Sequence, residues 1–358
     1  RTMTRNGVRH NNLHQLTGYT DSWVDNRTPG VSERVEITGV TYNAAGRLVY
    51  GHEVKTQTGL LESRVETDRW VKYDDQGRLL EEKTLSKADN GIVEEKERVV
   101  SGYNGFGNET GDETAIEERG FNKTGEEVYR ISTKTTKTDV YYDDHGRSAG
   151  YTETTVASDK PDMETKHVWT AAGYNTNDQL IGFNETWVGI SEAGEHETRT
   201  TRSGMKYDAV GRMVAYEDRT TGNADDTEET LTWTATGYNG AGLINGSEEV
   251  RSKICETPGA LYNVETRTTR TNMLYDLAGN LLHYTQTENG TDRPDLWTGT
   301  EWDGAYDALG RMARYLEKVR STDLGTGGQV LSTYEENDRL SMAYDGSNPL
   351  VGYTEKTL

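Results

Sequence analysis

Apolar and polar residues alternate along short stretches of this chain. Between residues 230 and 236, Leu231, Trp233 and Ala235 fall on one side of an extended backbone, and threonines fall on the other side. A period of two residues is typical of a β-strand with one packed face. The alternating stretches stand before and after a recurring turn pattern, so the chain is expected to form β-hairpins.

The turn pattern is an aromatic residue followed by Asn or Asp, two variable residues and Gly. Asn or Asp at the first position of a four-residue turn caps the backbone with its side chain, and Gly at the fourth position supplies a positive φ. An apolar pair and a second Tyr follow, as in residues 212–216. Each copy therefore predicts one β-hairpin. The predicted turn anchors are Tyr42 and Gly46, Tyr73 and Gly77, Tyr103 and Gly107, Tyr142 and Gly146, Tyr207 and Gly211, Tyr238 and Gly242, Tyr275 and Gly279, and Tyr306 and Gly310.

Three further copies depart from this pattern. One, Phe121–Gly125, begins with Phe, whereas Tyr174–Asp178 and Tyr344–Asn348 lack the final Gly. Turns that begin Tyr-Asn interleave with turns that begin Tyr-Asp. Anchors of one kind lie 64 to 71 residues apart in the series Tyr103, Tyr174 and Tyr238 and in the series Tyr73, Tyr142, Tyr207 and Tyr275. Two hairpins are thus expected to make one super-repeat.

Two tryptophans keep the spacing of the super-repeat. Trp169 and Trp233 each stand five residues before a Tyr-Asn turn and are 64 residues apart. Periodic aromatic residues on an apolar face favour equivalent core positions, and a stacking platform for a sugar is the alternative.

These patterns predict an all-β fold of tandem β-hairpin repeats that form an elongated or spiralling, solenoid-like antiparallel sheet. Outer strand ends such as residues 132–138 carry Thr and charge on both faces, and cross-strand pairs of about 0.2–1 kcal/mol do not stabilise a lone hairpin. Neighbouring hairpins must therefore pair. Residues 1–40 are expected to be an irregular or partial first repeat, and residues 41–358 the hairpin array. Because residues 344–358 keep the repeat pattern, we expect a longer chain.

The repeat resembles a known family. Tyr-Asp-x-x-Gly-Arg followed by apolar residues and Tyr, as in residues 207–216 and 306–315, is similar to the YD repeat of RHS proteins, insecticidal toxin-complex shells, wall-associated bacterial proteins and teneurins. The resemblance implies hairpins joined edge to edge into a spiralling sheet that encloses cargo or serves as an extracellular scaffold. The spacing of mostly 30 to 38 residues is longer than in that family, and the self-cleaving region that ends RHS shells is absent. The arginines that follow the turn Gly are Arg47, Arg78, Arg147, Arg212 and Arg311.

Composition narrows the class of protein. Apolar residues are 32% of the chain, which excludes a thick core, while 21 Tyr and seven Trp distinguish it from a disordered chain. Sixty acidic and 39 basic residues give a net charge of −21, which repels nucleic acid and anionic membrane surfaces. One cysteine, Cys255, cannot form an internal disulfide, and no apolar run reaches the ~18 residues of a membrane span.

Motifs for chemistry are missing from the sequence. Nucleophile-elbow, zinc-protease, phosphate-binding and dinucleotide-binding patterns do not occur. The seven His are scattered, and only His10 and His14 would share a face if their segment were helical. Acidic pairs such as Asp143 and Asp144 are expected to cap turns rather than to bind calcium. We therefore predict no catalytic residue, no cofactor and no metal site.

Together these observations predict a non-catalytic, extracellular or cell-surface structural repeat protein that acts as a fibre, a filament or a surface stalk. Its expected partners are further copies of itself or a continuation of the same chain, without nucleic acid and without membrane insertion. A glycan-binding adhesin that uses exposed Tyr and Trp is one alternative. A cargo-enclosing shell of the RHS or toxin-complex type is the other.

Overall fold

The computed structural model describes residues 2–24, 32–58, 62–191, 194–222, 227–255, 262–307, 311–323, 331–344 and 350–357. Every regular element in these ranges is a β-strand, so the prediction of an all-β hairpin array is confirmed. The chain divides into two compact units, residues 1–168 with 189–195 and residues 169–188 with 196–358. No helix in the described ranges has the length and apolarity needed to cross a membrane.

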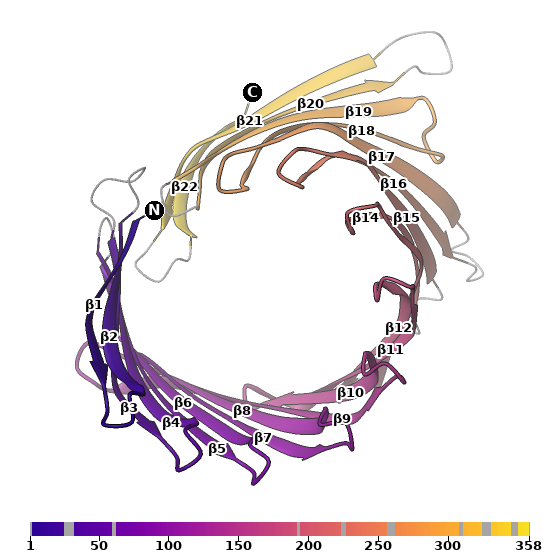
Figure 1. Ribbon diagram of the computed structural model, residues 1–358. Helices are drawn as coiled ribbons and strands as arrows, with labels where there is room; N and C mark the ends of the chain where they lie inside the picture. Colours follow the sequence, from indigo (N-terminus) through magenta and orange to yellow (C-terminus); the bar gives the residue numbers. More distant parts are fainter. Residues whose placement is uncertain are drawn as a thin grey trace. The chain divides into compact units, whose positions relative to one another are not determined.

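The first unit is a curved antiparallel sheet in which each strand pairs with the next one along the chain (Figure 1). Its strands are β1 (Thr2–His10), β2 (Leu16–Val24), β3 (Ser32–Tyr42), β4 (Leu48–Thr58), β5 (Ser63–Tyr73), β6 (Leu79–Ala88), β7 (Ile92–Tyr103), β8 (Glu109–Phe121), β9 (Glu127–Tyr142) and β10 (Ser148–Ala157). The division between the units falls in the next three strands, β11 (Lys160–Tyr174), β12 (Leu180–Ser191) and β13 (Gly194–Tyr207).

The second unit repeats this arrangement, with antiparallel pairing in chain order from β13 onward. Its further strands are β14 (Met213–Gly222), β15 (Thr227–Tyr238), β16 (Ile244–Cys255), β17 (Tyr262–Tyr275), β18 (Leu281–Gly290), β19 (Leu296–Tyr306), β20 (Met312–Asp323), β21 (Leu331–Tyr344) and β22 (Leu350–Thr357).

The predicted turns lie together in each unit. Turns with the motif follow odd-numbered strands, so within a unit they lie at the same end of the strands, which we call the motif end. The Phe121–Gly125 copy is different, because it joins β8 to β9 and therefore lies at the opposite end. A hairpin that the sequence did not reveal joins β1 to β2 through Asn11–Gln15, a motif-end turn without Tyr or Gly.

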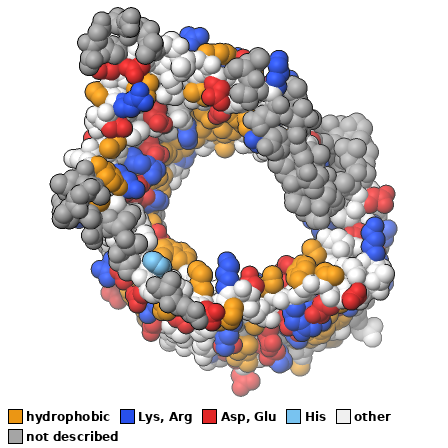
Figure 2. Space-filling model, turned by 180° about the vertical axis from the view of Figure 1, so that it is seen from behind, with side chains coloured by type: hydrophobic (Ala, Val, Ile, Leu, Met, Phe, Trp, Pro, Cys, Tyr) orange, Lys and Arg blue, Asp and Glu red, His pale blue; other side chains and the backbone are white. Residues whose placement is uncertain are grey.

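The hydrophobic core is thin, as the composition requires. Within the described ranges, the hydrophobic side chains that are at most 9% exposed are Val40, Val71, Val100, Met205, Cys255 and Trp302. The first four stand two or three residues before a motif Tyr, so burial concentrates near the motif end. Elsewhere, Lys and Arg alternate with Asp and Glu over the surface seen in Figure 2, with hydrophobic side chains between them.

Bulges give the hairpins a second periodicity. In β3, β9, β13 and β17 the third residue before the motif Tyr has a positive φ, and the strand register shifts there. In the preceding strand a glycine faces this bulge, because an added Cβ would lie 2.5–3.0 Å from a carbonyl oxygen of the bulged strand. The four pairs of facing glycine and bulge residue are Gly18 with Gly39, Gly111 with Asp139, Gly182 with Gly204, and Gly246 with Asn272. The bulges thus recur in every second hairpin from β9 onward.

Candidate functional site: the motif end

The motif turns share one backbone geometry. In the first predicted turn, the Asn43 amide donates to the Arg47 carbonyl at 2.9 Å, and the Gly46 amide donates to the Asn43 carbonyl at 2.9 Å. The Asn43 side-chain oxygen accepts from the amides of Ala45 and Arg47 at 3.0 Å each. The same side-chain cap recurs at Asp208, which accepts from the Arg212 amide at 2.9 Å. Asn or Asp therefore holds each turn closed from within.

The fourth turn position has the predicted positive φ. Its φ values are 78° at Gly46, 87° at Gly77, 86° at Gly107, 77° at Gly146, 89° at Gly211, 81° at Gly242 and 90° at Gly279. Gly310 lies outside the described residues. Asp178 and His14 take this position with a φ of 60° each, which is a conformation that few side chains adopt without cost.

The motif tyrosines join each hairpin to the one before it. The Tyr103 hydroxyl donates to the Leu79 carbonyl at 2.6 Å, two residues past the preceding motif-end glycine. Four other tyrosines make the same bond to the equivalent carbonyl: Tyr42 to Leu16 at 2.6 Å, Tyr142 to Glu109 at 2.9 Å, Tyr207 to Leu180 at 2.7 Å, and Tyr238 to Met213. Burial raises the pKa of Tyr103 and Tyr142, as it does for Tyr207, Tyr275 and Tyr306.

Two Tyr-Asp turns that are followed by Arg add a charged contact to this bond. Arg78 pairs with Asp74 of its own turn at 2.7 Å and lies over the ring of Tyr103, 4.4 Å from its centroid. Arg212 repeats both contacts, at 2.6 Å to Asp208 and 4.4 Å to the Tyr238 ring. We call the set of Asp, Arg, next motif Tyr and carbonyl acceptor a motif link.

The turn arginine lowers the pKa of the turn carboxylate. Asp143 pairs with Arg147 at 2.6 Å, and the hydrogen bond from this guanidinium lowers the pKa of Asp143 to about 2. The pKa of Asp74 and of Asp208 is also lowered, first by the backbone amide of the turn arginine and then by its side chain. The turn carboxylates are therefore held in the charged form.

The turn that begins at Tyr174 carries a neutral pair instead. Asn175 donates to the Gln179 side chain at 2.9 Å, and Gln179 reaches the Gly211 carbonyl of the next motif-end turn at 3.4 Å. In the first hairpin, Asn11 and Gln15 make the same amide pair at 2.7 Å. The residue after the turn, Arg or Gln, thus decides whether this contact is charged or neutral.

Aromatic side chains are stacked across the strands of the second unit. The Tyr284 and Trp302 rings stack at 5.5 Å, and Trp302 continues onto Tyr315 at 6.4 Å. Arginines lie over both outer rings, Arg270 at 5.6 Å from Tyr284 and Arg339 at 5.1 Å from Tyr315. Stacked rings between cations stabilise a sheet that lacks a thick core.

The two periodic tryptophans pack in a similar way. Trp233 stacks on Tyr216 at 5.2 Å, and Arg202 lies 3.9 Å from the centroid of the same Tyr216 ring. Trp169 lies 6.3 Å from Phe183. These contacts favour the predicted core positions over a sugar-stacking platform for these two side chains.

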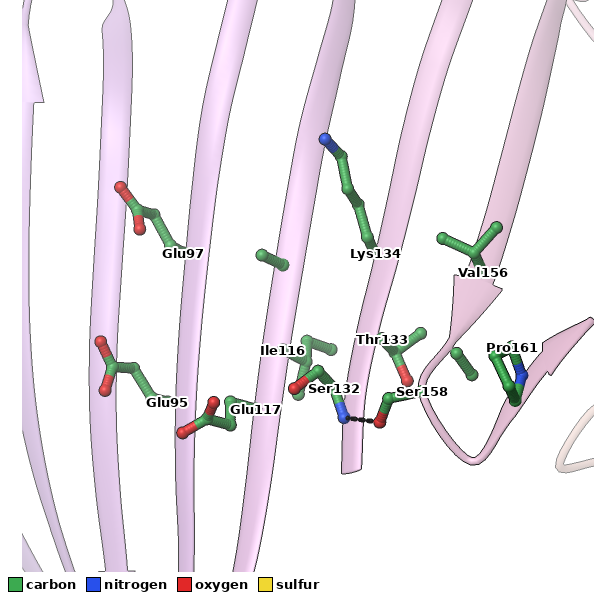
Figure 3. A pocket seen from close by; sticks show the side chains of 12 residues that line it. Glu95, Glu97, Ile116, Glu117, Ser132, Thr133, Lys134, Val156, Ser158 and Pro161 are labelled. Atoms are coloured by element: carbon green, nitrogen blue, oxygen red, sulfur yellow. Dashed lines mark hydrogen bonds between the residues drawn. The ribbon is translucent and has the colours of Figure 1, made fainter. Parts of the chain in front are cut away.

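A shallow depression crosses β7 to β11 in the first unit, with a volume of about 550 Å³ (Figure 3). Glu95, Glu117 and Lys134 line it together with the apolar side chains of Val156 and Pro161. Its charges have partners: Lys83 pairs with Glu95, Arg130 with Glu117 at 3.4 Å, and Lys134 with Glu113 at 2.9 Å. The depression therefore resembles an ordinary ion-paired sheet surface more than a reaction site.

One group in the described ranges has the side chains of a metal site. His283, Glu301 and Asp303 place one ligand atom each within 4.8 Å of one another. The histidines that the sequence placed together do not meet in this way: His10 ends β1 and His14 closes the following turn. The sequence predicted no metal site because the three ligands come from two strands.

Comparison with known proteins adds no identification. No protein-family model matches the chain, and no curated protein matches its sequence. The resemblance to YD repeats therefore rests on the motif residues alone.

Proposed function

We propose that this chain is a non-catalytic, extracellular structural repeat protein, in which the hairpin array itself is the functional object, as a fibre, a filament or a surface stalk. The observation that supports this most directly is the motif link. The recurrent side chains of the repeat, Tyr103 and Arg78 among them, contact the neighbouring hairpin, whereas recurrent side chains of an enzyme family converge on one pocket.

The edge strand supports self-association or continuation of the array. β1 pairs with β2, and all nine of its residues are exposed. Exposed edge strands present unpaired backbone groups to another strand. The net charge of −21 keeps assembled chains apart laterally, since like charges repel beyond contact distance unless salt screens them.

The resemblance to YD repeats supports the extracellular location. Its Tyr-Asp-x-x-Gly-Arg residues are the ones that form the motif link, so the pattern and the structural role coincide at residues 74–78 and 208–212. A scaffold made of such links needs no further chemistry to function.

Two measurements test this proposal. Immunogold labelling of the producing cells is expected to mark the cell surface or extracellular fibres, and label confined to the cell interior would contradict it. Electron microscopy of the purified chain over a salt series is expected to give filaments that bundle as salt rises. A monomer at every salt and protein concentration, with hydrogen-exchange protection of the β1 amides, would exclude self-association.

A glycan-binding adhesin is the second candidate. Trp187 and Trp297 are 43% and 49% exposed, and aromatic rings at this exposure can stack on a sugar. A glycan array with the wild-type chain and with Trp297→Ala tests this function. Binding that disappears in the variant would support the adhesin, and an array without signal would discard it.

A further inference from the structure

Strand pairing in the second unit brings a histidine and two carboxylates together. His283 in β18 lies directly opposite Asp303 in β19, and Thr285 lies opposite Glu301. Residues two apart on a strand point to the same face, so Glu301, Asp303 and His283 share one side of the sheet. Tyr284 and Trp302 stack on the other side, which fixes the backbone beneath the three ligands.

The distances fit a single small ion. His283 Nδ1 and Asp303 Oδ1 are 2.8 Å apart, and the ligand atoms of all three residues lie within 4.8 Å of one another. Bonds of about 2.0–2.2 Å from zinc to nitrogen and oxygen place neighbouring ligand atoms about 3–3.5 Å apart. A side-chain rotation of Glu301, which is exposed, closes the remaining gap.

A second His–Asp pair in the chain has a similar distance, but the carboxylates beside it are held by other side chains. His52 Nδ1 lies 2.9 Å from Asp68 Oδ1 across β4 and β5. The Tyr50 hydroxyl donates to the same Asp68 oxygen at 2.7 Å, and Glu66 pairs with Arg64 at 2.5 Å. The carboxylates of this pair are therefore engaged by other groups.

The two carboxylates beside His283 are less engaged. Leu281 stands two residues before His283, where Tyr50 stands before His52, and leucine has no donor for Asp303. The partner of Glu301 is Lys318, whose Nζ is 3.6 Å away. This pair is long, and the Lys318 and Glu301 side chains are 34% and 47% exposed, so it competes weakly with a metal ion.

We propose that His283, Glu301 and Asp303 bind one divalent transition-metal ion of the zinc class, with water in the remaining positions. Imidazole with two carboxylates is a ligand set that Zn²⁺ accepts, whereas Ca²⁺ and Mg²⁺ prefer oxygen ligands alone. The ion joins β18 to β19 and stabilises this hairpin pair by mass action.

Equilibrium dialysis of the full chain against Zn²⁺ tests the proposal. Wild type is expected to bind one ion per chain with a dissociation constant near the micromolar range. We expect His283→Gln to weaken this binding at least 10-fold and Glu301→Gln to weaken it several-fold. His52→Gln is the matched control and should retain the full affinity.

Cobalt absorption provides a readout that does not depend on the variants folding well. Co²⁺ bound to wild type should give visible d–d bands that an excess of Zn²⁺ removes. The proposal is overturned by absence of saturable Zn²⁺ binding below about 1 mM. It is also overturned if His52→Gln lowers the affinity as much as His283→Gln does.

Discussion

Removal of one hydroxyl group measures the strength of the motif link. Tyr103→Phe deletes the donor of the 2.6 Å bond to the Leu79 carbonyl and leaves the ring beneath Arg78. A hydrogen bond of this kind contributes about 0.5–1.5 kcal/mol net. Leu79 is half-buried, so water replaces the hydroxyl in part. We expect a loss of about 1 kcal/mol.

The ring contributes separately through Arg78. A guanidinium 4.4 Å from the Tyr103 centroid contributes about 0.5–1 kcal/mol at a partly exposed site. Tyr103→Leu removes both contacts and should cost about 1.5–2 kcal/mol from these two terms. Arg78→Met should then cost less in the Tyr103→Leu background than in wild type, and the difference is the coupling energy of the pair.

Hydrogen exchange read by mass spectrometry locates the effect. Protection should fall in β6 and β7, which the bond connects, and change little in the second unit because repeat arrays are coupled mainly to nearest neighbours. Tyr129→Phe is the matched control. The Tyr129 hydroxyl donates to a Glu118 carboxylate oxygen at 2.8 Å, and this exposed bond does not lie at the motif end. Equal losses in Tyr103→Phe and Tyr129→Phe, or a uniform loss along the chain, would refute the motif link as a stabilising contact.

Three further predictions concern the glycines and the turn carboxylates. Gly211→Val forces a branched side chain to a φ of 89° and should cost about 1–2 kcal/mol or more, with fraying confined to its hairpin in hydrogen exchange. Gly246→Ala places a Cβ 3.0 Å from the Arg270 carbonyl oxygen and should push β16 away from β17. Its denaturation midpoint should be lower than that of Gly240→Ala, where an added Cβ meets open space. Arg147 lowers the pKa of Asp143 to about 2. The contribution of Asp143 to the free energy of unfolding is therefore present above about pH 4 and is lost as the pH falls towards 2. Asp143→Asn should accordingly flatten the acid limb of a curve of unfolding free energy against pH.

The hairpins could be predicted because their turns are local. Asn or Asp at the first turn position and Gly at the fourth fix the backbone within five residues, as at residues 208–212. The same locality explains why the position of one turn and the existence of another could not be predicted. Phe121–Gly125 has the motif yet lies at the opposite end from the other turns, because turn chemistry does not specify the end of the sheet. The turn at Asn11 uses His14 with a φ of 60° in place of Gly, so it does not match the sequence motif.

The motif link and the metal cluster required the strand register. The acceptor of Tyr103 is the backbone carbonyl of Leu79. Every residue has a backbone carbonyl, so the residue types in the sequence do not identify the acceptor. His283 and Asp303 are 20 residues apart and become neighbours only when β18 and β19 pair without a shift over that part. A sequence that alternates in period two fixes which residues share a face, but the opposite residue depends on loop length and bulges.

Deletion of whole repeats distinguishes a two-hairpin unit from a one-hairpin unit. Removal of residues 208–275 joins Tyr207 to Asp276 and restores a Tyr-Asp turn, whose carboxylate accepts from Asn280 at 2.8 Å in place of Arg212. Tyr284 and Trp302 then take the places of Tyr216 and Trp233. Because every motif link joins adjacent hairpins only, this shorter chain should keep its circular dichroism per residue and its exchange protection up to the junction. Removal of residues 208–238 instead joins Tyr207 to Asn239, which sets two Tyr-Asn turns side by side and leaves no turn carboxylate at the junction. That junction should lose protection locally. Equal protection at both junctions would show that the alternation of turn kinds has no energetic role, and collapse of both chains would show that the array depends on contacts longer than nearest neighbours.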